Sequence, residues 1–385
     1  MLEIKLSAIK QMEEFARNNP NIISLSQGGL KVDAPTGEIK DSVQKILETN
    51  KADYYGQGSG LLELREKISE VLSKKYQTNI PIDQIIVTHG CNGALTNLML
   101  LLLTEDDEVI LPEPAYPSYT NLARIARAKP IYVSCQKEDK NKISWHLPVE
   151  QIKSATTNKT KMIIFSNPSN PTSTLASKKD LLQLIAWCEE KGIYLVVDEV
   201  YENYVFDGEF QSITPFIKTS KRIIKLTSFS KDFGLSGWRV GYMVLPENLS
   251  TMAYIMQDSL FICPTVISQH AALAALNNQH IAKYFHDYVK ENKNLVIKYL
   301  DPLRKKGIIN FQNPSAGFYT FIKVPEKNTT ELCLDMIKDI SVSLVPGGTF
   351  GPTSKDFVRI CFARNRSILE EGLKRLTVYW NKKYV

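Results

Sequence analysis

The stretch SFSKDFGLSGWRVGY, residues 228–242, follows an apolar run that is typical of a buried strand. Lys231 therefore falls in a predicted turn just beyond the end of that strand. Ser228 and Ser230 flank the lysine, and Arg239 follows in the same glycine-containing loop. Hydroxyls and a guanidinium around one loop favour a bound phosphate, because arginine forms charge-assisted, often bidentate hydrogen bonds. A lysine beside a phosphate ester favours a carbonyl partner, since an amine and an aldehyde form a Schiff base; taken alone, it is equally typical of a solvated side chain.

Short apolar runs alternate with helix-length amphipathic segments over most of the chain. Runs rich in Val and Ile predict strands at 85–90, 108–114, 129–135, 161–167, 193–199 and 222–230. Apolar residues recur at helical spacing in segment 61–72, before the first of these runs, and in segment 178–191, between two of them. This alternation predicts an α/β fold whose large domain has a mostly parallel sheet flanked by helices. Ligands of such sheets bind beyond the carboxyl ends of the strands.

The pattern changes after residue 265. A long helical stretch at 266–306 precedes strand-like runs at 317–324, 341–346 and 357–363 and a closing helix, which predicts a smaller α+β domain. The apolar run 22–25 leads into a Gly-Gly turn, so the N-terminal segment is expected to pack with this domain. We therefore expect a large cofactor-binding domain at 31–265 and a small domain formed by 1–30 and 266–385.

Two further strand ends carry polar residues. Asp198 ends the apolar run in VVDEVYENYVF (196–206), and Tyr201 follows it. A carboxylate there can keep a pyridine nitrogen protonated, or it can simply cap the next helix. Asn170, in SNPSNPTSTL (166–175), is held by Pro171 and is positioned to donate to the same ring, although Asn-Pro steps also occur in ordinary turns.

Two more loops suit an anion and a ring. THGCNGAL (88–95) predicts a strand, a glycine turn and a helix start, where the backbone N–H groups of residues 91–93 can bind an anion. PEPAYPSY (112–119) places Tyr116 at a strand end, where its ring can stack on a planar ligand or pack in the protein. Five such features in order at strand ends favour one shared site.

These residues resemble the class I/II aminotransferases, which are fold-type-I pyridoxal-phosphate enzymes. The family's lysine motif, Ser-x-Ser-Lys followed by Gly-x-x-Gly-x-Arg-x-Gly, is matched at 228–241, and the similarity extends from Gly28 to Arg359. The resemblance implies the family's large domain, with its seven-stranded type of sheet, and pyridoxal 5'-phosphate as cofactor. It also implies transfer of the α-amino group of an L-amino acid to a 2-oxo acid by a ping-pong mechanism.

The resemblance also implies roles for individual residues. Lys231 corresponds to the Schiff-base lysine and proton shuttle, and Asp198 to the partner of the pyridine nitrogen. Tyr201 and Asn170 correspond to contacts of the ring oxygen, and Tyr116 to the stacking aromatic. The phosphate site corresponds to Ser228, Ser230, Arg239 and the backbone of Cys91 and Asn92. Gly28 and Arg359 correspond to substrate-binding residues, Arg359 holding the α-carboxylate, and Tyr55 to a tyrosine lent to the partner subunit of a homodimer.

Two positions depart from the family's pattern, and both lie on the substrate side. Ser173 replaces the glycine of the usual Asn-Pro-Thr-Gly, and Gly29 and Leu30 follow Gly28 where an aromatic residue or proline is usual. The alternative is a lyase, cyclase, decarboxylase or oxidase that uses the same cofactor and carbanion, because a fold does not select the reaction. The identity of the amino acid stays open.

Composition disfavours several other classes. The 47 basic and 41 acidic residues give a net charge of +6 without a basic stripe, so no nucleic-acid partner is expected. The six cysteines form no CxxC pair, which argues against a metal site or a disulfide framework and favours the cytoplasm. No apolar run approaches the length of a membrane span, and no secretory signal is recognisable. A regulatory amino-acid sensor would carry an added DNA-binding segment, for which we expect no spare length in this sequence. A nicotinamide dehydrogenase is disfavoured because no GxGxxG follows an early strand.

Overall fold

A computed structural model describes residues 8–137 and 143–384. Its centre is a seven-stranded sheet with the order β2-β10-β9-β8-β7-β3-β4. Its strands are β2 (Ile85–Thr88), β3 (Glu108–Glu113), β4 (Lys129–Ser134), β7 (Thr160–Ser166), β8 (Tyr194–Asp198), β9 (Ile223–Ser228) and β10 (Gly241–Val244). β10 runs antiparallel to both of its neighbours, whereas the other pairings are parallel. The predicted α/β fold with a mostly parallel sheet is confirmed.

Each of the six runs that predicted strands in this part of the chain coincides with one strand of this sheet, although β7 begins one residue before its run, at Thr160. The predictions were too long at the carboxyl ends, because polar or glycine residues begin loops or helices there. Gly90, at a φ of +69°, starts a helix directly after β2. β10 was not among the predicted strands; its first two residues, Gly241 and Tyr242, belong to the glycine-containing motif at 228–242.

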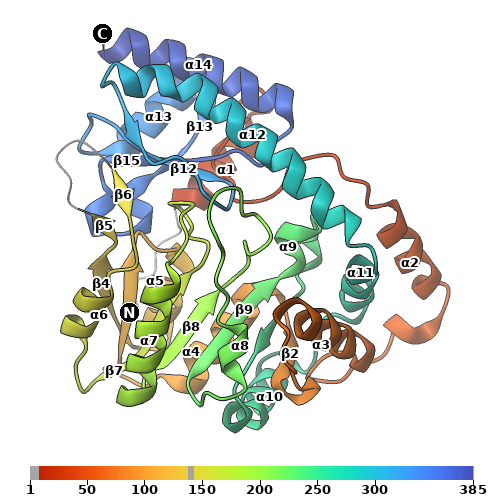
Figure 1. The fold of residues 1–385 in the computed structure, drawn as a ribbon. Helices are drawn as coiled ribbons and strands as arrows, with labels where there is room; N and C mark the ends of the chain where they lie inside the picture. Colours follow the sequence, from red (N-terminus) through yellow and green to blue (C-terminus); the bar gives the residue numbers. More distant parts are fainter. Residues whose placement is uncertain (1–7, 138–142, 385) are drawn as a thin grey trace.

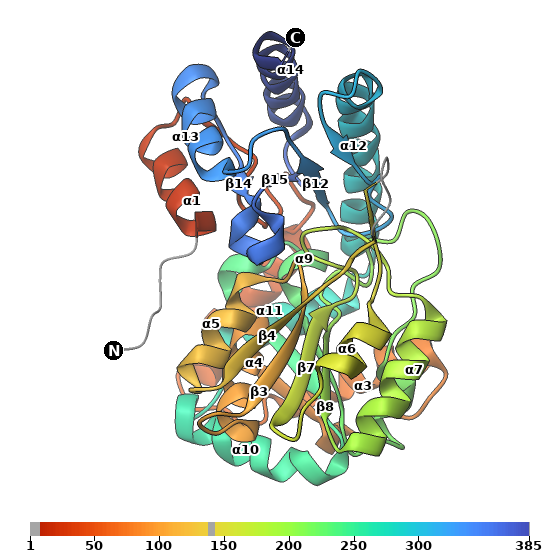
Figure 2. The same cartoon turned by 90° about the vertical axis from the view of Figure 1, so that its left-hand side faces the viewer.

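Helices cover both faces of the sheet (Figures 1 and 2). The helices of this part are α2 (Gly37–Leu47), α3 (Leu62–Tyr76), α4 (Gly90–Leu102), α5 (Pro117–Ile125), α6 (Val149–Ala155), α7 (Lys178–Lys191), α8 (Thr214–Ile217), α9 (Phe229–Asp232) and α10 (Glu247–Phe261). Neighbouring residues along a strand pack into different apolar clusters: Ile86 packs with α4 and α10, and Val87 with the cluster that includes α3 and α7. Apolar residues therefore fill both faces, and polar side chains collect at the strand ends.

A second sheet has the order β11-β12-β15-β14 and is antiparallel throughout. Its strands are β11 (Asn310–Phe311), β12 (Tyr319–Lys323), β14 (Val345–Pro346) and β15 (Phe357–Cys361). Helices α1 (Ala8–Asn18), α12 (His280–Lys305), α13 (Thr329–Ile340) and α14 (Arg366–Tyr384) lie around it, above the larger sheet in Figure 2. β1 (Ile23–Ser24) pairs in parallel with β13 (Val342–Ser343), which joins the N-terminal segment to this region.

Two sequence predictions in this region were wrong in detail. The stretch 266–306 forms two helices, α11 (Val266–Asn277) and α12, which are separated at Asn278 and Gln279. The run 341–346 forms two short strands, because β13 pairs with β1 while β14 pairs with β15. β5 (Gln136–Lys137) pairs antiparallel with β6 (Ser144–Trp145) in a further two-stranded sheet.

The division into domains at residue 265/266 stays a prediction. α11 packs against α2 and α3, which belong to the predicted large domain. No helix in the described part of the chain is both long and apolar enough to cross a membrane.

Candidate active site

The carboxyl ends of β7, β8 and β9 lie side by side, so the residues that follow them meet at one edge of the sheet. Lys231 lies in the short helix α9 directly after β9, and not in the irregular turn that the sequence suggested. Ser228 begins this helix, and its hydroxyl accepts a hydrogen bond from the backbone N–H of Ser230 at 3.2 Å. The helical turn places Lys231 at the sheet edge shared with Asp198.

The Lys231 amine is half-buried and donates a hydrogen bond to the backbone carbonyl of Gly28. Its Nζ lies 5.9 Å from the centre of the Tyr201 ring and 5.7 Å from that of Phe318. Removal from water is the main cause that lowers the pKa of this amine to about 8, and the Arg359 cation acts in the same direction. With this pKa, roughly a tenth of Lys231 is neutral and nucleophilic at pH 7, which is far more than for an ordinary lysine.

Asp198 is the last residue of β8 and is buried. Its carboxylate accepts hydrogen bonds from the Tyr119 hydroxyl at 2.8 Å and from the backbone N–H of Val200 at 3.2 Å. Burial raises the pKa of Asp198, while the hydrogen bonds from Tyr119, Val200 and the Cys91 thiol oppose that rise. A buried carboxylate held in this way suits a cationic ring nitrogen.

An anion cradle forms at the start of α4. This helix has no side-chain cap, so its first N–H groups, at Cys91 and Asn92, have no capping partner in the described part of the protein. Arg239 lies over Gly90: a Cβ added at Gly90 would come within 2.8 Å of its guanidinium, so glycine is required for this approach. The hydroxyls of Ser228 and Ser230 are 2.8 Å apart in the loop that precedes Arg239.

Arg359, in the middle of β15, is only 1% exposed. Its guanidinium donates to Asn170 Oδ1 at 3.0 Å and to the backbone carbonyl of Ser26 at 2.6 Å. It also stacks over the Tyr319 ring at 4.4 Å. Its Nε is buried without a partner among the described residues, so a donor remains for an anionic ligand.

Tyr319 connects the two sides of this site and was not recognised from the sequence. Its hydroxyl shares a 2.7 Å hydrogen bond with the Tyr201 hydroxyl and lies 3.5 Å from the Gly28 carbonyl. A Cβ at Gly28 would come within 2.6 Å of the Tyr319 hydroxyl, so only glycine fits there. Tyr119, the partner of Asp198, was also missed, although it lies three residues after Tyr116 in the motif that had been singled out.

The remaining candidate residues lie at different distances from this centre. Tyr116 precedes α5, and its ring packs edge-on against Tyr119 with centroids 5.5 Å apart. Tyr55 is 82% exposed and forms no hydrogen bond with the other candidates in the described part of the chain. The structure therefore brings together all the predicted residues except Tyr55, which projects from the surface.

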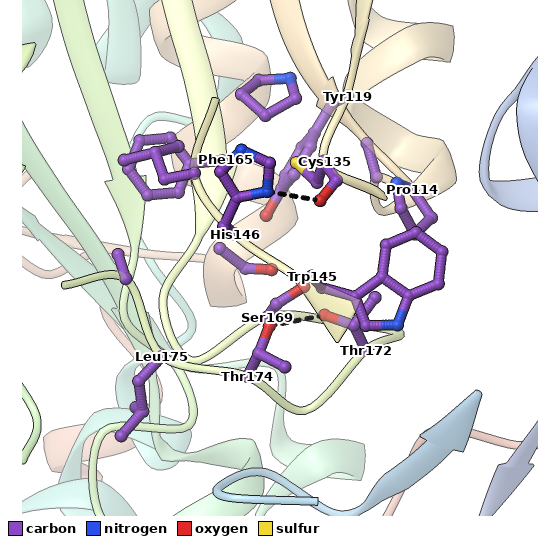
Figure 3. Close-up of a pocket in the computed structure, with 15 residues that line it drawn as sticks. Pro114, Tyr119, Cys135, Trp145, His146, Phe165, Ser169, Thr172, Thr174 and Leu175 are labelled. Carbon is purple, nitrogen blue, oxygen red and sulfur yellow. Dashed lines mark hydrogen bonds between the residues drawn. The ribbon is translucent and has the colours of Figure 1, made fainter. Parts of the chain in front are cut away.

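A further pocket has Tyr119, the hydrogen-bond partner of Asp198, in its lining (Figure 3). Trp145, Phe165 and Leu175 contribute much of its apolar lining. His146 Nδ1 lies 3.1 Å from the Cys135 carbonyl at one wall, and the hydroxyls of Thr172 and Thr174 are 2.8 Å apart at another. Lys231, Asp198 and Arg359 are not among the residues that line this pocket.

A buried ion network lies beneath the site. Lys225, in β9, is completely buried and contacts the carboxylates of Glu199 at 2.9 Å and Glu202 at 2.7 Å. Burial alone would lower the pKa of Lys225, yet the two carboxylates raise it well above its ordinary value. This network was not predicted, because the sequence around a lysine in an apolar strand does not reveal which carboxylates will contact it in the fold.

The donor set matches the chemistry of pyridoxal phosphate. An uncapped helix start with Arg239 suits a phosphate, the buried Asp198 suits a pyridinium nitrogen, and the Lys231 amine suits an aldehyde. Arg359, with an unpartnered buried Nε among the described residues, suits a carboxylate.

Comparison with known proteins agrees with this geometry. The family model for class I and II aminotransferases matches residues 20–376. The chain belongs to this family. It is an aminotransferase, and enzymes of this family depend in general on pyridoxal phosphate.

Several relatives of this aminotransferase cover nearly the whole chain. It is 31% identical to the aspartate aminotransferase of Sulfolobus acidocaldarius over 91% of this chain and 88% of that protein. It is 30% identical to the aromatic-amino-acid aminotransferase 2 of Thermococcus litoralis over 96% and 94%, respectively. The crystal structure of the aspartate aminotransferase of Thermotoga maritima superimposes with a TM-score of 0.88 at 30% identity, covering 98% of each chain. Since relatives named for different amino acids are about equally similar, identity alone does not select a substrate.

Ser173, which replaces the usual glycine, has a φ of +56° and is completely buried. Its hydroxyl accepts a hydrogen bond from the backbone N–H of Tyr319 at 3.0 Å. We expect Ser173→Ala to lower the free energy of unfolding by about 1–3 kcal/mol, because that N–H loses its partner. Ser173→Gly should cost about 1 kcal/mol less than the alanine variant, because glycine removes the strain of the positive φ.

Urea denaturation of the three proteins measures both differences. A glycine variant that is no more stable than the alanine variant would show that backbone strain at Ser173 is absent.

Proposed function

We propose that this aminotransferase binds pyridoxal phosphate through Lys231 and moves the α-amino group of an L-amino acid to a 2-oxo acid by a ping-pong mechanism. The observation that carries the proposal is the Lys231 amine, whose pKa is lowered to about 8 at the sheet edge it shares with Asp198. Arg359 lies across from it, on the second sheet, as an anion partner. An amine, a buried acid and a buried cation are the groups that this reaction requires.

The proposed cofactor contacts are those that the family resemblance implies, and the positions of these side chains support them. Lys231 would hold the aldehyde carbon, and Asp198 would hold the pyridine nitrogen. Tyr201 and Asn170 would contact the ring oxygen; the amide nitrogen of Asn170 is available for this, because the Oδ1 of Asn170 already accepts from Arg359. Tyr116 would stack on the ring, and the phosphate would be held by Ser228, Ser230, Arg239 and the N–H groups of Cys91 and Asn92.

The protein's own groups carry out substrate binding and proton transfer. When bound, the cofactor supplies a carbonyl for Schiff-base formation and a ring that withdraws electrons from the substrate α-carbon. Arg359 binds the substrate carboxylate and so fixes the direction of the α-carbon–hydrogen bond. With the cofactor bound, the Lys231 amine would be the group that accepts the substrate α-proton at its Nζ and gives it back during the transfer. Asp198 keeps the ring nitrogen protonated, and Gly28 lies close enough for its carbonyl to orient the lysine amine.

The visible absorption spectrum tests this function. A yellow band should form with pyridoxal phosphate, bleach with one class of amino acid, and return with a 2-oxo acid. Initial-velocity plots should give parallel lines, as a ping-pong mechanism requires; intersecting lines would contradict it. Release of ammonia, carbon dioxide or peroxide, without return of the band, would instead indicate the lyase, decarboxylase or oxidase alternative.

The pKa of Lys231 predicts how the cofactor-free protein responds to pH. Only the neutral amine attacks an aldehyde, so the rate of reaction with pyridoxal phosphate should rise with pH and level off above about 8. The rate for an ordinary lysine would level off only near the usual lysine pKa of about 10.4. Stopped-flow absorbance measures the rate, and borohydride reduction with peptide mass spectrometry identifies the lysine. The control is Nα-acetyl-lysine, whose ε-amine is free. If the midpoint of the rate–pH curve were the same for the protein and for this control, the lowered pKa of Lys231 would be contradicted.

We also propose a homodimer in which Tyr55 reaches the partner subunit's phosphate site. Tyr54 and Tyr55 are 71% and 82% exposed on one segment, which supports a subunit contact there. A cytoplasmic location remains our expectation from the cysteine content. The small-molecule partners of the proposed reaction are an amino acid and a 2-oxo acid.

A further inference from the structure

A cavity of about 370 Å³ lies outside the proposed active site, between α1, β1 and the start of α14. Ser24 and Gln27 line it from β1 and the loop that follows it. The next residue along this loop, Gly28, contacts Lys231 through its carbonyl. The loop thus has the proposed active site on one side and this cavity on the other.

Three cationic side chains line the cavity: Arg17 of α1, Lys31 after the loop, and Arg364 before α14. Arg17 and Lys31 form no side-chain hydrogen bond or ion pair with any other described residue. Burial lowers the pKa of Lys31 most, and the Arg364 cation and, more weakly, the Arg17 cation lower it further, while the Glu13 carboxylate acts in the opposite direction. Like charges that meet in one cavity repel one another, and an anion between them would relieve this repulsion.

Arg364 forms the floor of the cavity and is only 2% exposed, so its position is fixed by the surrounding protein. Its guanidinium donates to the backbone carbonyls of Ser24 at 2.8 Å and Gly29 at 2.6 Å, and also to that of Gln27. No carboxylate in the described residues pairs with it. These carbonyl dipoles orient the Arg364 side chain but leave its net charge uncompensated.

The one carboxylate in the described lining, Glu13, does not balance the three cations. Its Oε2 is 2.9 Å from the Lys10 ammonium, which already pairs with it. The cavity therefore keeps an excess of positive charge, with the Gln27 side chain as a further polar group in its wall.

We propose that this cavity binds a small multivalent anion, such as a phosphate or dicarboxylate group, between Arg17 and Lys31 and above Arg364. Charge-assisted bonds from Arg and Lys are the usual means of holding such groups. A bound anion would fix the position of α1 relative to the Gly28 loop, because Arg17 comes from the helix and Arg364 holds the loop. The proposal rests on the cavity and does not depend on the proposed reaction.

Inorganic phosphate and malonate are suitable probes for the protein of residues 1–385. Pyridoxal phosphate is added so that it occupies the proposed cofactor-phosphate site. Thermal unfolding and calorimetric titration are measured at constant ionic strength, with chloride as the reference salt. The test variant is Arg17→Gln combined with Lys31→Gln. Its matched control is Lys178→Gln combined with Lys179→Gln, which removes the same charge from an exposed part of α7.

We expect at least one of the two anions to bind saturably and raise the unfolding temperature of the wild-type and control proteins. The affinity of the test variant should fall by about tenfold or more, because two charge-assisted partners are lost. Comparing phosphate with malonate shows which anionic group the cavity prefers. Malonate can also bind at Arg359, and that binding would persist in the test variant. Only the malonate binding that is lost in the test variant is therefore assigned to the cavity.

Two results would overturn the proposal: equal affinity in the test and control variants, or effects no larger than those of chloride. Failure of the yellow band to form would contradict the proposed function. It would leave this comparison interpretable, since the test variant is changed only at the cavity and the control variant only on α7.

Discussion

Replacing Lys231 by alanine should abolish amino-group transfer, with a loss in kcat of roughly 10⁴-fold or more, because the side chain is both the proposed aldehyde partner and the proposed proton carrier. The amine approaches the backbone carbonyl of Gly28 and is only half-buried, so folding should persist. The far-ultraviolet circular dichroism and the unfolding midpoint should therefore remain close to those of the wild type. The measurement is single-turnover conversion of an amino acid to its 2-oxo acid.

A matched control for this variant is Lys178→Ala, which removes an exposed lysine at the start of α7 and should leave turnover unchanged. Addition of a small primary amine should restore part of the activity of the Lys231 variant, because the amine can carry the proton in place of the side chain. Appreciable transamination by Lys231→Ala without added amine would remove this residue from the proposed mechanism.

The largest expected effect on stability is at Lys225. Replacing it by methionine keeps the bulk of the side chain but leaves the carboxylates of Glu199 and Glu202 buried without their shared cation. Breaking a buried ion pair on one side typically costs about 3–5 kcal/mol, since the remaining charge is uncompensated. We expect a loss of this size in the free energy of unfolding, measured by chemical denaturation at neutral pH.

Lys75→Met is the matched control, because Lys75 also faces Glu202, at 3.5 Å, but with a side chain that is 34% exposed. An exposed partner contributes about 1 kcal/mol or less. If Lys225→Met cost no more than this control, the buried network would not be a source of stability.

The loss in the free energy of unfolding caused by Lys225→Met should also depend on pH. Without the cation, the folded-state pKa values of the two buried carboxylates should rise above the unfolded value of about 4.3. The folded variant then binds more protons than the unfolded chain, so its stability should increase as the pH falls through these raised values. The difference from the wild type is therefore expected to be smaller at about pH 5 than at about pH 8, and a difference that grew on acidification would contradict this account.

The local sequence was sufficient to predict the α/β fold and to select Lys231, Asp198 and Arg239 as candidates. Each of these residues lies in or beside a loop at the end of an apolar strand, where a polar side chain is conspicuous. Because parallel strands end at the same edge of a sheet, residues chosen one strand at a time meet in space without further information. The positions of their side chains follow from this rule, whereas their roles remain proposals.

Contacts between distant segments were decided only by the tertiary structure. The Tyr201–Tyr319 hydrogen bond joins residues 118 positions apart, and the bond from Arg364 to the Gly29 carbonyl joins residues 335 positions apart. Neither periodicity nor turn chemistry carries information about such pairs, because both describe only neighbours along the chain. The packing of the second sheet against the strand ends set these distances, and with them the lowered pKa of Lys231, the burial of Arg359 and the cationic cavity behind the Gly28 loop.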